Sequence, residues 1–163
     1  MCKDYEEASA TYAAGARLGA PPWMAAMAAR MRADGGSRVA AGQMYQHLYD
    51  STGDEAVKQM IDKQLMRLDS LDERDLIRGV LQEFKARNGR CANSWREVQR
   101  ELGAASIEIT RLNDPSDASS VKSYHTFKFD KTGAPLDPSS TPYELIKGGC
   151  DVDLDINTEV PFK

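Results

Sequence analysis

The side chains best suited to acid–base or metal chemistry in this chain are its two histidines, His47 and His125. Neither belongs to an H-x-x-x-H or H-E-x-x-H pattern, and neither has a cysteine or histidine at ligand spacing. His47 falls beside the apolar stripe of an expected helix, which predicts a partly exposed position or one at a helix contact. His125 shares a strand face with Phe127 and Phe129, so we expect a hydrogen-bonded histidine of the core.

Motifs for nucleophilic catalysis and for phosphate binding are missing. The sequence holds no G-x-S-x-G, no cysteine beside an identifiable base, no G-x-x-x-x-G-K and no G-x-G-x-x-G. Gly148-Gly149 is expected to form a turn. We therefore expect a protein that is not an enzyme, with no catalytic residue, no cofactor and no metal-ligating residue that can be assigned.

Three aspartates, Asp151, Asp153 and Asp155, alternate with apolar residues near the end of the chain. A strand would place these carboxylates on one face, where they could chelate a hard cation. Alternate positions on a strand lie about 6.5–7 Å apart, however, which is too far to share one small ion. A solvated strand face, opposite Val152, Leu154 and Ile156, is the simpler interpretation.

The three cysteines, Cys2, Cys91 and Cys150, are odd in number, widely spaced and form no C-x-x-C pair. This pattern favours reduced or incidental thiols over a disulfide framework. A single bridge between Cys91 and Cys150 stays open, because the sequence gives no distance between them.

The composition is that of a globular chain of one domain, or of one domain and a small appendage. Its 163 residues are 41% hydrophobic and 28% charged. The net charge of −4 and the lack of a basic block argue against nucleic-acid binding. No stretch approaches the roughly 18–20 apolar residues of a membrane span, and residues 1–20 lack the apolar centre of a signal peptide. The compartment, cytoplasmic or periplasmic, stays undetermined.

Apolar periodicity predicts helices over roughly residues 3–18, 22–35 and 37–50. The second of these is expected to start at Pro22 and to stop at Gly35-Gly36. Its methionines, Met24, Met27 and Met31, recur at helical spacing and are expected in the core. On the third, Ala40, Met44 and Leu48 form the expected apolar face.

Three further helices are expected to begin at capping boxes, in which a hydroxyl and a carboxylate satisfy the first N–H groups of a helix. These boxes are Thr52–Glu55, Ser70–Glu73 and Ser94–Glu97. The sequence thus predicts about six helices before Gly103.

The first helix carries alternating large and small residues that allow close helix packing: Tyr5, Ala8, Tyr12, Ala16 and Leu18. Pro21-Pro22-Trp23 follows where the next helix must begin, and Ala8 and Ala40 lie 32 residues apart. This order resembles the second helix of one tetratricopeptide repeat (TPR) followed by the first helix of the next repeat. A TPR is about 34 residues long, which is close to the observed separation. The resemblance implies an antiparallel helical array of TPR type over residues 1–70, which binds a protein or peptide.

After residues 104–106 the pattern changes to that of a small antiparallel sheet of three or four strands. Ile107 and Ile109 begin it, and Tyr143 to Ile156 predict a hairpin about Lys147-Gly148-Gly149. We expect an α+β protein whose second part, residues 71–163, packs on the repeats, with Trp95 buried at the junction of its helices and strands. Tyr143 is expected to point inward from a rigid Pro138–Pro142 corner.

The segment FDKTGAPLDPSSTPYEL, residues 129–145, follows a long helix ending in Asn-Gly-Arg and a short helix. This order resembles the C-terminal module of type II secretion pseudopilins, which carry an Asp-Pro-x-Gly-x-Pro-Tyr turn before a final hairpin. Ser140 stands where that pattern has glycine, and the hydrophobic N-terminal helix of a pilin is absent. Some pseudopilins bind calcium beside this hairpin, so the resemblance implies two alternative ligand sets: Asp151, Asp153 and Asp155, or Asp114, Asp117 and Asp130.

Together these patterns resemble the C-terminal part of a bacterial TPR protein that ends in a pseudopilin-like module. The expected function is a non-enzymatic scaffold for protein–protein interaction. The alternative function is that of a structural component of a secretion- or pilus-like assembly. One version of this alternative has a C-terminal β tail that calcium stabilises. Self-association stays open, since an array of repeats can leave an apolar end face.

Overall fold

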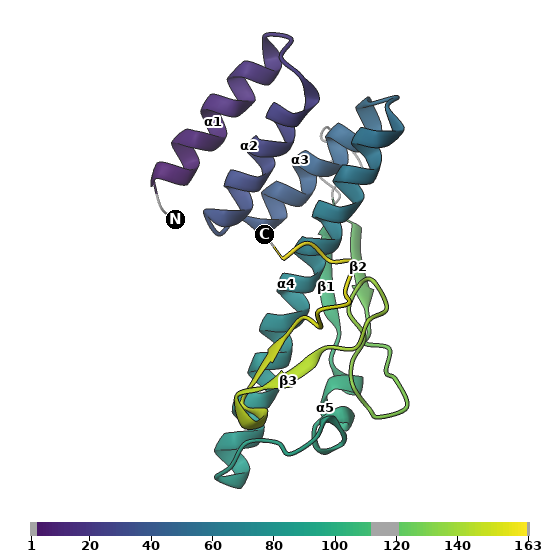
Figure 1. The fold of residues 1–163 in the computed structure, drawn as a ribbon. Coiled ribbons are helices and arrows are strands. Elements are labelled where there is room, and N and C mark those ends of the chain that lie inside the picture. Colours follow the sequence, from purple (N-terminus) through teal and green to yellow (C-terminus); the bar gives the residue numbers. More distant parts are fainter. Residues whose placement is uncertain (1–2, 112–120, 163) are drawn as a thin grey trace. The chain divides into compact units, whose positions relative to one another are not determined.

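The computed structural model describes residues 3–111 and 121–162 and is mostly helical (Figure 1). It divides into two compact units, one formed by residues 1–68 with 110–122 and the other by residues 69–109 with 123–163. The α-helices of the described residues are α1 (Lys3–Arg17), α2 (Pro22–Asp34), α3 (Arg38–Ser51), α4 (Glu55–Asn88) and α5 (Gln99–Ala104). The strands are β1 (Ile107–Arg111), β2 (Val121–His125), β3 (Glu144–Ile146) and β4 (Asp151–Asp153).

The α+β class is confirmed, but the finer architecture differs from the expectation. The described residues form five α-helices rather than six, and the strands pair as β1 with β2 and β3 with β4 rather than in one sheet of three or four. The β3–β4 pair is antiparallel, with Leu145 opposite Val152. No described helix combines the length and the hydrophobicity that a bilayer crossing requires.

The first unit contains α1, α2, α3 and the first part of α4, with α1 packed on α2 and α2 packed on α3 (Figure 1). As predicted, α2 begins at Pro22 and ends before Gly35. Ala28 and Ala29 are fully buried on α2, and Ser9 of α1 donates its hydroxyl to the carbonyl of Ala28 at 2.9 Å. Alanine side chains thus bring these helices close together.

The predicted apolar faces of these helices are partly wrong. Met24, Met27 and Met31 are half-buried, whereas the buried side chains of α2 are alanines. On α3 the buried residues are Ala41 and Tyr45, one position later than the expected Ala40–Met44–Leu48 face. Leu18 lies after the end of α1 and is 89% exposed. The physical reason is that helices packed through small residues leave long side chains at the edges of the contact.

Helix α4 is continuous across the position where a new helix was expected at Ser70. Ser70 and Glu73 lie inside it and are buried, so their capping-box interpretation is wrong. Thr52 does not cap the helix either, because the carboxylate of Asp54 accepts the N–H groups of Ala56 at 2.8 Å and Val57 at 3.3 Å. The side chain of Ser94 makes no capping bond, and the 3₁₀ turn Trp95–Glu97 precedes α5.

In the second unit, Trp95 lies where the helices meet the C-terminal strands, as predicted. It is 8% exposed, and its indole N–H donates to the carbonyl of Tyr143 at 3.2 Å. Tyr143 itself is 2% exposed, which confirms its inward direction. Ile156 was expected to share the buried side of Val152 and Leu154 but is 85% exposed, because β4 ends at Asp153.

The expectation of reduced thiols is wrong for two of the three cysteines. Cys91, after the end of α4, and Cys150, after the β3–β4 turn, form a disulfide with 5.0 Å between their Cα atoms. Gly149, at φ +85°, lies so close to the backbone of Ala92 that a Cβ atom would overlap the Ala92 carbonyl. The hairpin turn and the end of α4 therefore meet in backbone contact as well as through the bridge.

Candidate functional site

The most distinctive polar group of the second unit is the buried carboxylate of Glu73 on α4. Its side chain is 5% exposed. One oxygen, Oε2, accepts the phenolic O–H of Tyr143 at 2.7 Å, and the other, Oε1, lies 2.7 Å from Nε2 of His125. The hydroxyl of Ser70, on the same face of α4, lies 3.1 Å from the Tyr143 oxygen. We call these four residues the Glu73 network.

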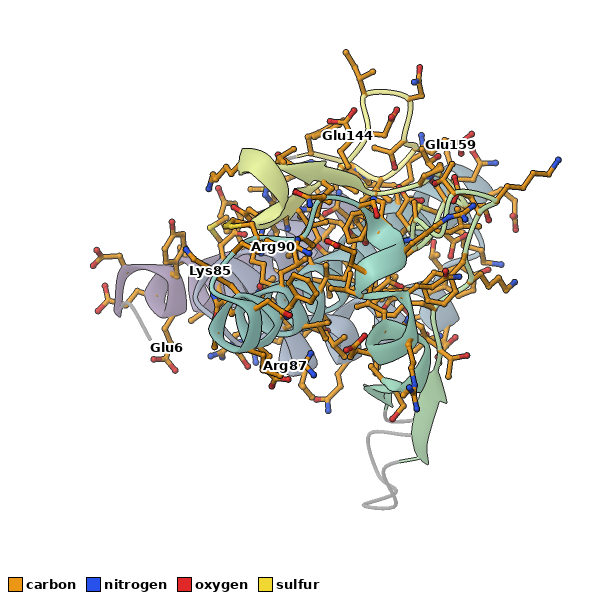
Figure 2. All side chains as sticks on the ribbon, turned by 90° about the horizontal axis from the view of Figure 1, so that it is seen from below. Glu6, Lys85, Arg87, Arg90, Glu144 and Glu159 are labelled. Carbon is orange, nitrogen blue, oxygen red and sulfur yellow. A yellow bond between two sulfur atoms is a disulfide. The ribbon has the colours of Figure 1, made fainter. Side chains whose placement is uncertain are left out.

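The Glu73 network joins three segments that are far apart in the sequence. Ser70 and Glu73 come from α4, His125 is the last residue of β2, and Tyr143 directly precedes β3. Charged residues elsewhere in this unit, such as Lys85, Arg87 and Glu144, are exposed and point outward (Figure 2). Among the described residues, Glu73 and Asp137 are the acidic residues that are buried, and both lie in this unit.

Burial sets the acid–base properties of the Glu73 network. It raises the pKa of Glu73 above the usual value, because a carboxylate out of water loses hydration, although the bonds from Tyr143 and His125 oppose this rise. Burial and the nearby Glu73 charge raise the pKa of Tyr143, which stays a neutral O–H donor. The side chain of His125 is 32% exposed, so water can reach this pair from its histidine side.

The corner from Asp137 to Tyr143 is fixed by a second buried carboxylate. One oxygen of Asp137 accepts the N–H groups of Ser139 at 2.8 Å and Thr141 at 2.9 Å, and the other accepts the hydroxyl of Thr158. Ser140 adopts φ +68°, a left-handed conformation that favours glycine. Such a closely bonded corner is a rigid element that aims Tyr143 inward.

The Glu73 network forms part of the wall of a pocket of about 270 Å³. Side chains of α4, of the end of β2 with the residues after it, and of the corner with the preceding Leu136 line the pocket. They are Asp69, Glu73, His125, Thr126, Phe127, Lys128, Leu136, Asp137, Pro138 and Ser140. Both carboxylate oxygens of Glu73 are bonded within the protein. Glu73 therefore holds the pocket wall together and does not present a free carboxylate to a substrate.

The structure does not gather into a site the candidate cation ligands that it describes, which are Asp130, Asp151, Asp153 and Asp155. Asp151 accepts hydrogen bonds from Nζ of Lys147 at 2.6 Å and from Nε of Arg78 at 2.9 Å, and these bonds hold the pKa of Asp151 well below its usual range. Asp153 pairs with Arg74 at 3.3 Å. In residues 3–111 and 121–162, no three Asp, Glu, His or Cys side chains are grouped as a metal site.

Two further candidate ligands, Asp155 of the first set and Asp130 of the alternative set, bond to nearby groups of the chain instead. Asp155 accepts the N–H of Asn157 at 2.7 Å, and Asp130 accepts the N–H of Thr132 at 2.8 Å within the turn of residues 130–133. Asp114 and Asp117 lie outside the described residues. The other candidate histidine, His47, is exposed on α3 and belongs to the first unit.

The first unit exposes large apolar side chains on its helices. Trp23, at the start of α2, is 52% exposed, and its ring meets that of Tyr12 of α1 edge-on, with 6.4 Å between centroids. Val39 on α3 is 52% exposed and Tyr5 on α1 is 40% exposed. Exposed aromatic residues of this kind are enriched where proteins bind one another.

Sequence reasoning missed Ser70 and Glu73 as members of a buried network. A signal was present, because these positions continue the helical spacing of the buried residues Ile77, Leu81 and Phe84. A polar residue on an apolar stripe indicates a buried, bonded group. The Ser70–Glu73 spacing also fits a capping box, and the sequence analysis therefore placed these residues at the start of a helix.

No protein family, curated protein or solved structure matches this chain.

Proposed function

We propose that this chain is a non-enzymatic module for protein–protein interaction, built on helices of TPR type. The dimensions of the first unit support the proposal. Helices α2 and α3 have 13 and 14 residues, and a connection through Gly35 and Gly36 joins them. This is the size of the helix pair that makes one TPR unit.

The observation that carries this proposal is the exposed aromatic pair of Trp23 and Tyr12. A tryptophan that is 52% exposed has a large apolar surface in contact with water. Burying such a ring against a partner is favourable, and Trp and Tyr are over-represented among the residues that dominate binding energy. The proposed partner is therefore a protein or peptide with an apolar side chain for this surface.

The experiment that tests the proposal is photo-crosslinking. A photoreactive phenylalanine analogue placed at Trp23 should capture a partner in cells of the source organism. The same analogue at Phe162, which is 59% exposed in the second unit, is the control. The captured protein is then purified and its affinity measured by calorimetry.

We expect Trp23→Ala to weaken this affinity at least tenfold, because truncation of a tryptophan that a partner buries is among the most costly changes at an interface. Phe162→Ala should leave the affinity unchanged. Capture of equal strength at both positions, or an affinity that Trp23→Ala does not alter, would contradict the proposal. Capture of a second copy of this chain would instead assign the surface to self-association.

A second candidate function is that of a structural component in a secretion- or pilus-like assembly. The observation that favours it is Ser140, whose left-handed backbone at φ +68° occupies the glycine position of the pseudopilin turn pattern. Sedimentation velocity at rising concentration, with and without millimolar calcium, tests this function. Calcium-dependent polymers would support it, whereas a monomer at every concentration would argue against it.

A further inference from the structure

The hairpin β3–β4 has an edge that no other described strand covers. Within residues 3–111 and 121–162, β3 pairs with β4 and with no further strand. The edge of β3 that faces away from β4 is therefore the one to consider. Such an edge presents backbone N–H and C=O groups to which an extended peptide can add as a new strand.

The hydrogen bonds of Val152 indicate which backbone groups point to this edge. Val152 lies opposite Leu145 in the hairpin. Its N–H donates to the carboxylate of Asp151 at 2.8 Å, and its carbonyl accepts a hydrogen bond from Arg78 at 3.5 Å. Because both groups bond to side chains, Val152 and Leu145 form a pair without mutual backbone hydrogen bonds. The N–H and C=O groups of Leu145 therefore point away from β4.

Tyr143, two residues before Leu145, points its backbone groups to the same edge. Its N–H donates to the carbonyl of Pro135 at 2.9 Å, and its carbonyl accepts the indole N–H of Trp95 at 3.2 Å. Outside the β3–β4 pair, no described group is hydrogen-bonded to the backbone of Leu145. Among these residues, the edge is thus covered at Tyr143 and uncovered at Leu145.

A pocket of about 430 Å³ lies beside Leu145, and its volume is in the range of ligand sites. Trp95, which is buried, and Leu145, which is half-buried, are its large apolar side chains. Asn93, Ser94 and Thr132 are exposed and add polar groups to its wall. The pocket can thus take one apolar side chain of a peptide whose backbone bonds to Leu145.

The walls of this pocket are held together by the disulfide. Residues 92–95 follow Cys91, and Gly148 and Gly149 precede Cys150, so the bridge joins the two sides. Gly149 also lies against the backbone of Ala92. A site that is already formed costs less to order when a peptide binds.

Charged groups beside the pocket favour an acidic peptide. Arg96 and Lys131 are exposed, each adjoins a lining residue in the sequence, and Arg96 donates to the carbonyl of Lys131 at 3.3 Å. The neighbouring carboxylates are bonded elsewhere, Glu97 to Arg90 at 2.7 Å and Asp130 to N–H groups of its own turn. The positive charges of Arg96 and Lys131 can therefore attract a carboxylate of a ligand.

The charged residues of the hairpin itself do not reverse this preference. Glu144 is next to Leu145, but successive side chains of a strand point to opposite faces, so Glu144 faces away from the pocket. Lys147 is paired with Asp151 at 2.6 Å.

We propose that the uncovered edge of β3 binds an extended peptide segment of a partner protein. The peptide adds a strand beside Leu145, places one apolar side chain in the pocket next to Trp95, and directs an acidic residue toward Arg96 and Lys131. This inference goes beyond the proposed function, which concerns Trp23 in the first unit, and does not depend on it.

The probe is a phage-displayed library of random seven-residue peptides, selected on the full chain with its disulfide intact. Affinities of synthetic copies of the enriched peptides are measured by calorimetry, and their site is mapped by NMR. We expect peptides with an apolar residue beside Asp or Glu, which shift the amide signal of Leu145 and the indole N–H signal of Trp95. Methylation of the peptide nitrogen that pairs with Leu145 should weaken binding about tenfold, because it removes a backbone hydrogen bond.

Two substitutions with matched controls test the site on the protein. Ser94→Tyr places a ring at the pocket and should weaken binding at least tenfold, whereas Ser106→Tyr, at an exposed serine of the same unit, should not. Lys131→Glu should weaken binding about fivefold, and the exposed control Arg100→Glu should have little effect. If Ser94→Tyr does not fold, Lys131→Glu and the methylated peptide decide.

Three results would overturn the proposal. The first is a library that yields no binding peptide, or peptides whose affinity is the same after methylation at every nitrogen. The second is a set of peptides that shift Trp23 and leave Leu145 unchanged, which would support the proposed function alone. The third is a Leu145 signal that shifts with protein concentration in the absence of peptide, which would assign the edge to a second copy of this chain.

Discussion

The helices of the first unit meet through alanines, whereas the segments of the second unit are joined by a disulfide, a buried carboxylate and a network of hydroxyl groups. Ala28, Ala29 and Ala41 are fully buried in the first unit. In the second unit, the Glu73 network and the Cys91–Cys150 bridge connect segments 52 to 73 residues apart. Neighbouring helices need only close packing, but distant short segments need specific bonds.

This difference follows from how much regular structure each unit contains. Helices satisfy their own backbone hydrogen bonds, so apolar contact is sufficient to pack them. The hairpin β3–β4 has only three residues in each strand, and a hairpin of this size is marginal in water without support. The second unit should therefore depend on a few polar and covalent links, and the first on the fit of small side chains.

The largest effect is expected from loss of the disulfide. Cys150→Ser should lower the free energy of unfolding of the second unit by about 4 kcal/mol, because the bridge closes a chain separation of 59 residues. Urea denaturation, followed by Trp95 fluorescence in a Trp23→Phe background, measures this loss. Cys2→Ser is the control and should change nothing. An unaltered unfolding midpoint in Cys150→Ser would show that the bridge is not needed for the hairpin.

In the first unit, overpacking is expected to be the most harmful change. Ala28→Leu should cost about 1–3 kcal/mol, because Ala28 has no exposed surface and lies against α1 through the Ser9 hydroxyl. Ala10→Leu, at an exposed position of α1, is the matched control. Circular dichroism during thermal unfolding gives the comparison. Equal midpoints for the two variants would mean that α1 and α2 are not closely packed.

The Glu73 network should be sensitive to a single oxygen atom. Tyr143→Phe removes the O–H that Glu73 accepts at 2.7 Å and should cost about 1–3 kcal/mol. The bond from Tyr143 lowers the pKa of Glu73, so its loss disfavours the ionised carboxylate further. The destabilisation should therefore be greater at pH 8 than at pH 5, as measured by urea denaturation at both values. Tyr5→Phe is the exposed control, and a deficit that is the same at both pH values would contradict this role for the hydroxyl.

The smallest effect is a gain in stability at the corner. Ser140→Gly should stabilise the second unit by about 0.5–1 kcal/mol, because glycine adopts φ +68° without the steric cost that a Cβ atom brings. Ser139→Gly should have the opposite effect, because the Ser139 hydroxyl bonds Asp137 at 2.7 Å. Thermal unfolding of the two variants tests both. Destabilisation by Ser140→Gly would indicate that the serine side chain has a role of its own.

The sequence by itself predicted the features that local backbone chemistry decides. Proline fixed the start of α2 at Pro22, and Gly148-Gly149 marked the turn between β3 and β4. Tyr143 and Trp95 were predicted to be buried from their place beside short strands and helices, and both are. These signals work because a proline ring or a missing Cβ restricts the chain wherever it lies.

The tertiary structure alone decided the features that depend on distant partners. The pattern Ser70–Glu73 is a good helix cap in isolation, yet α4 continues through it because Tyr143 and His125 bond these side chains instead. The pairing of Cys91 with Cys150 depends on the same folding of distant segments against each other. Local spacing cannot specify a contact across 50 residues or more, because the energy of that contact exists only after the segments between have folded.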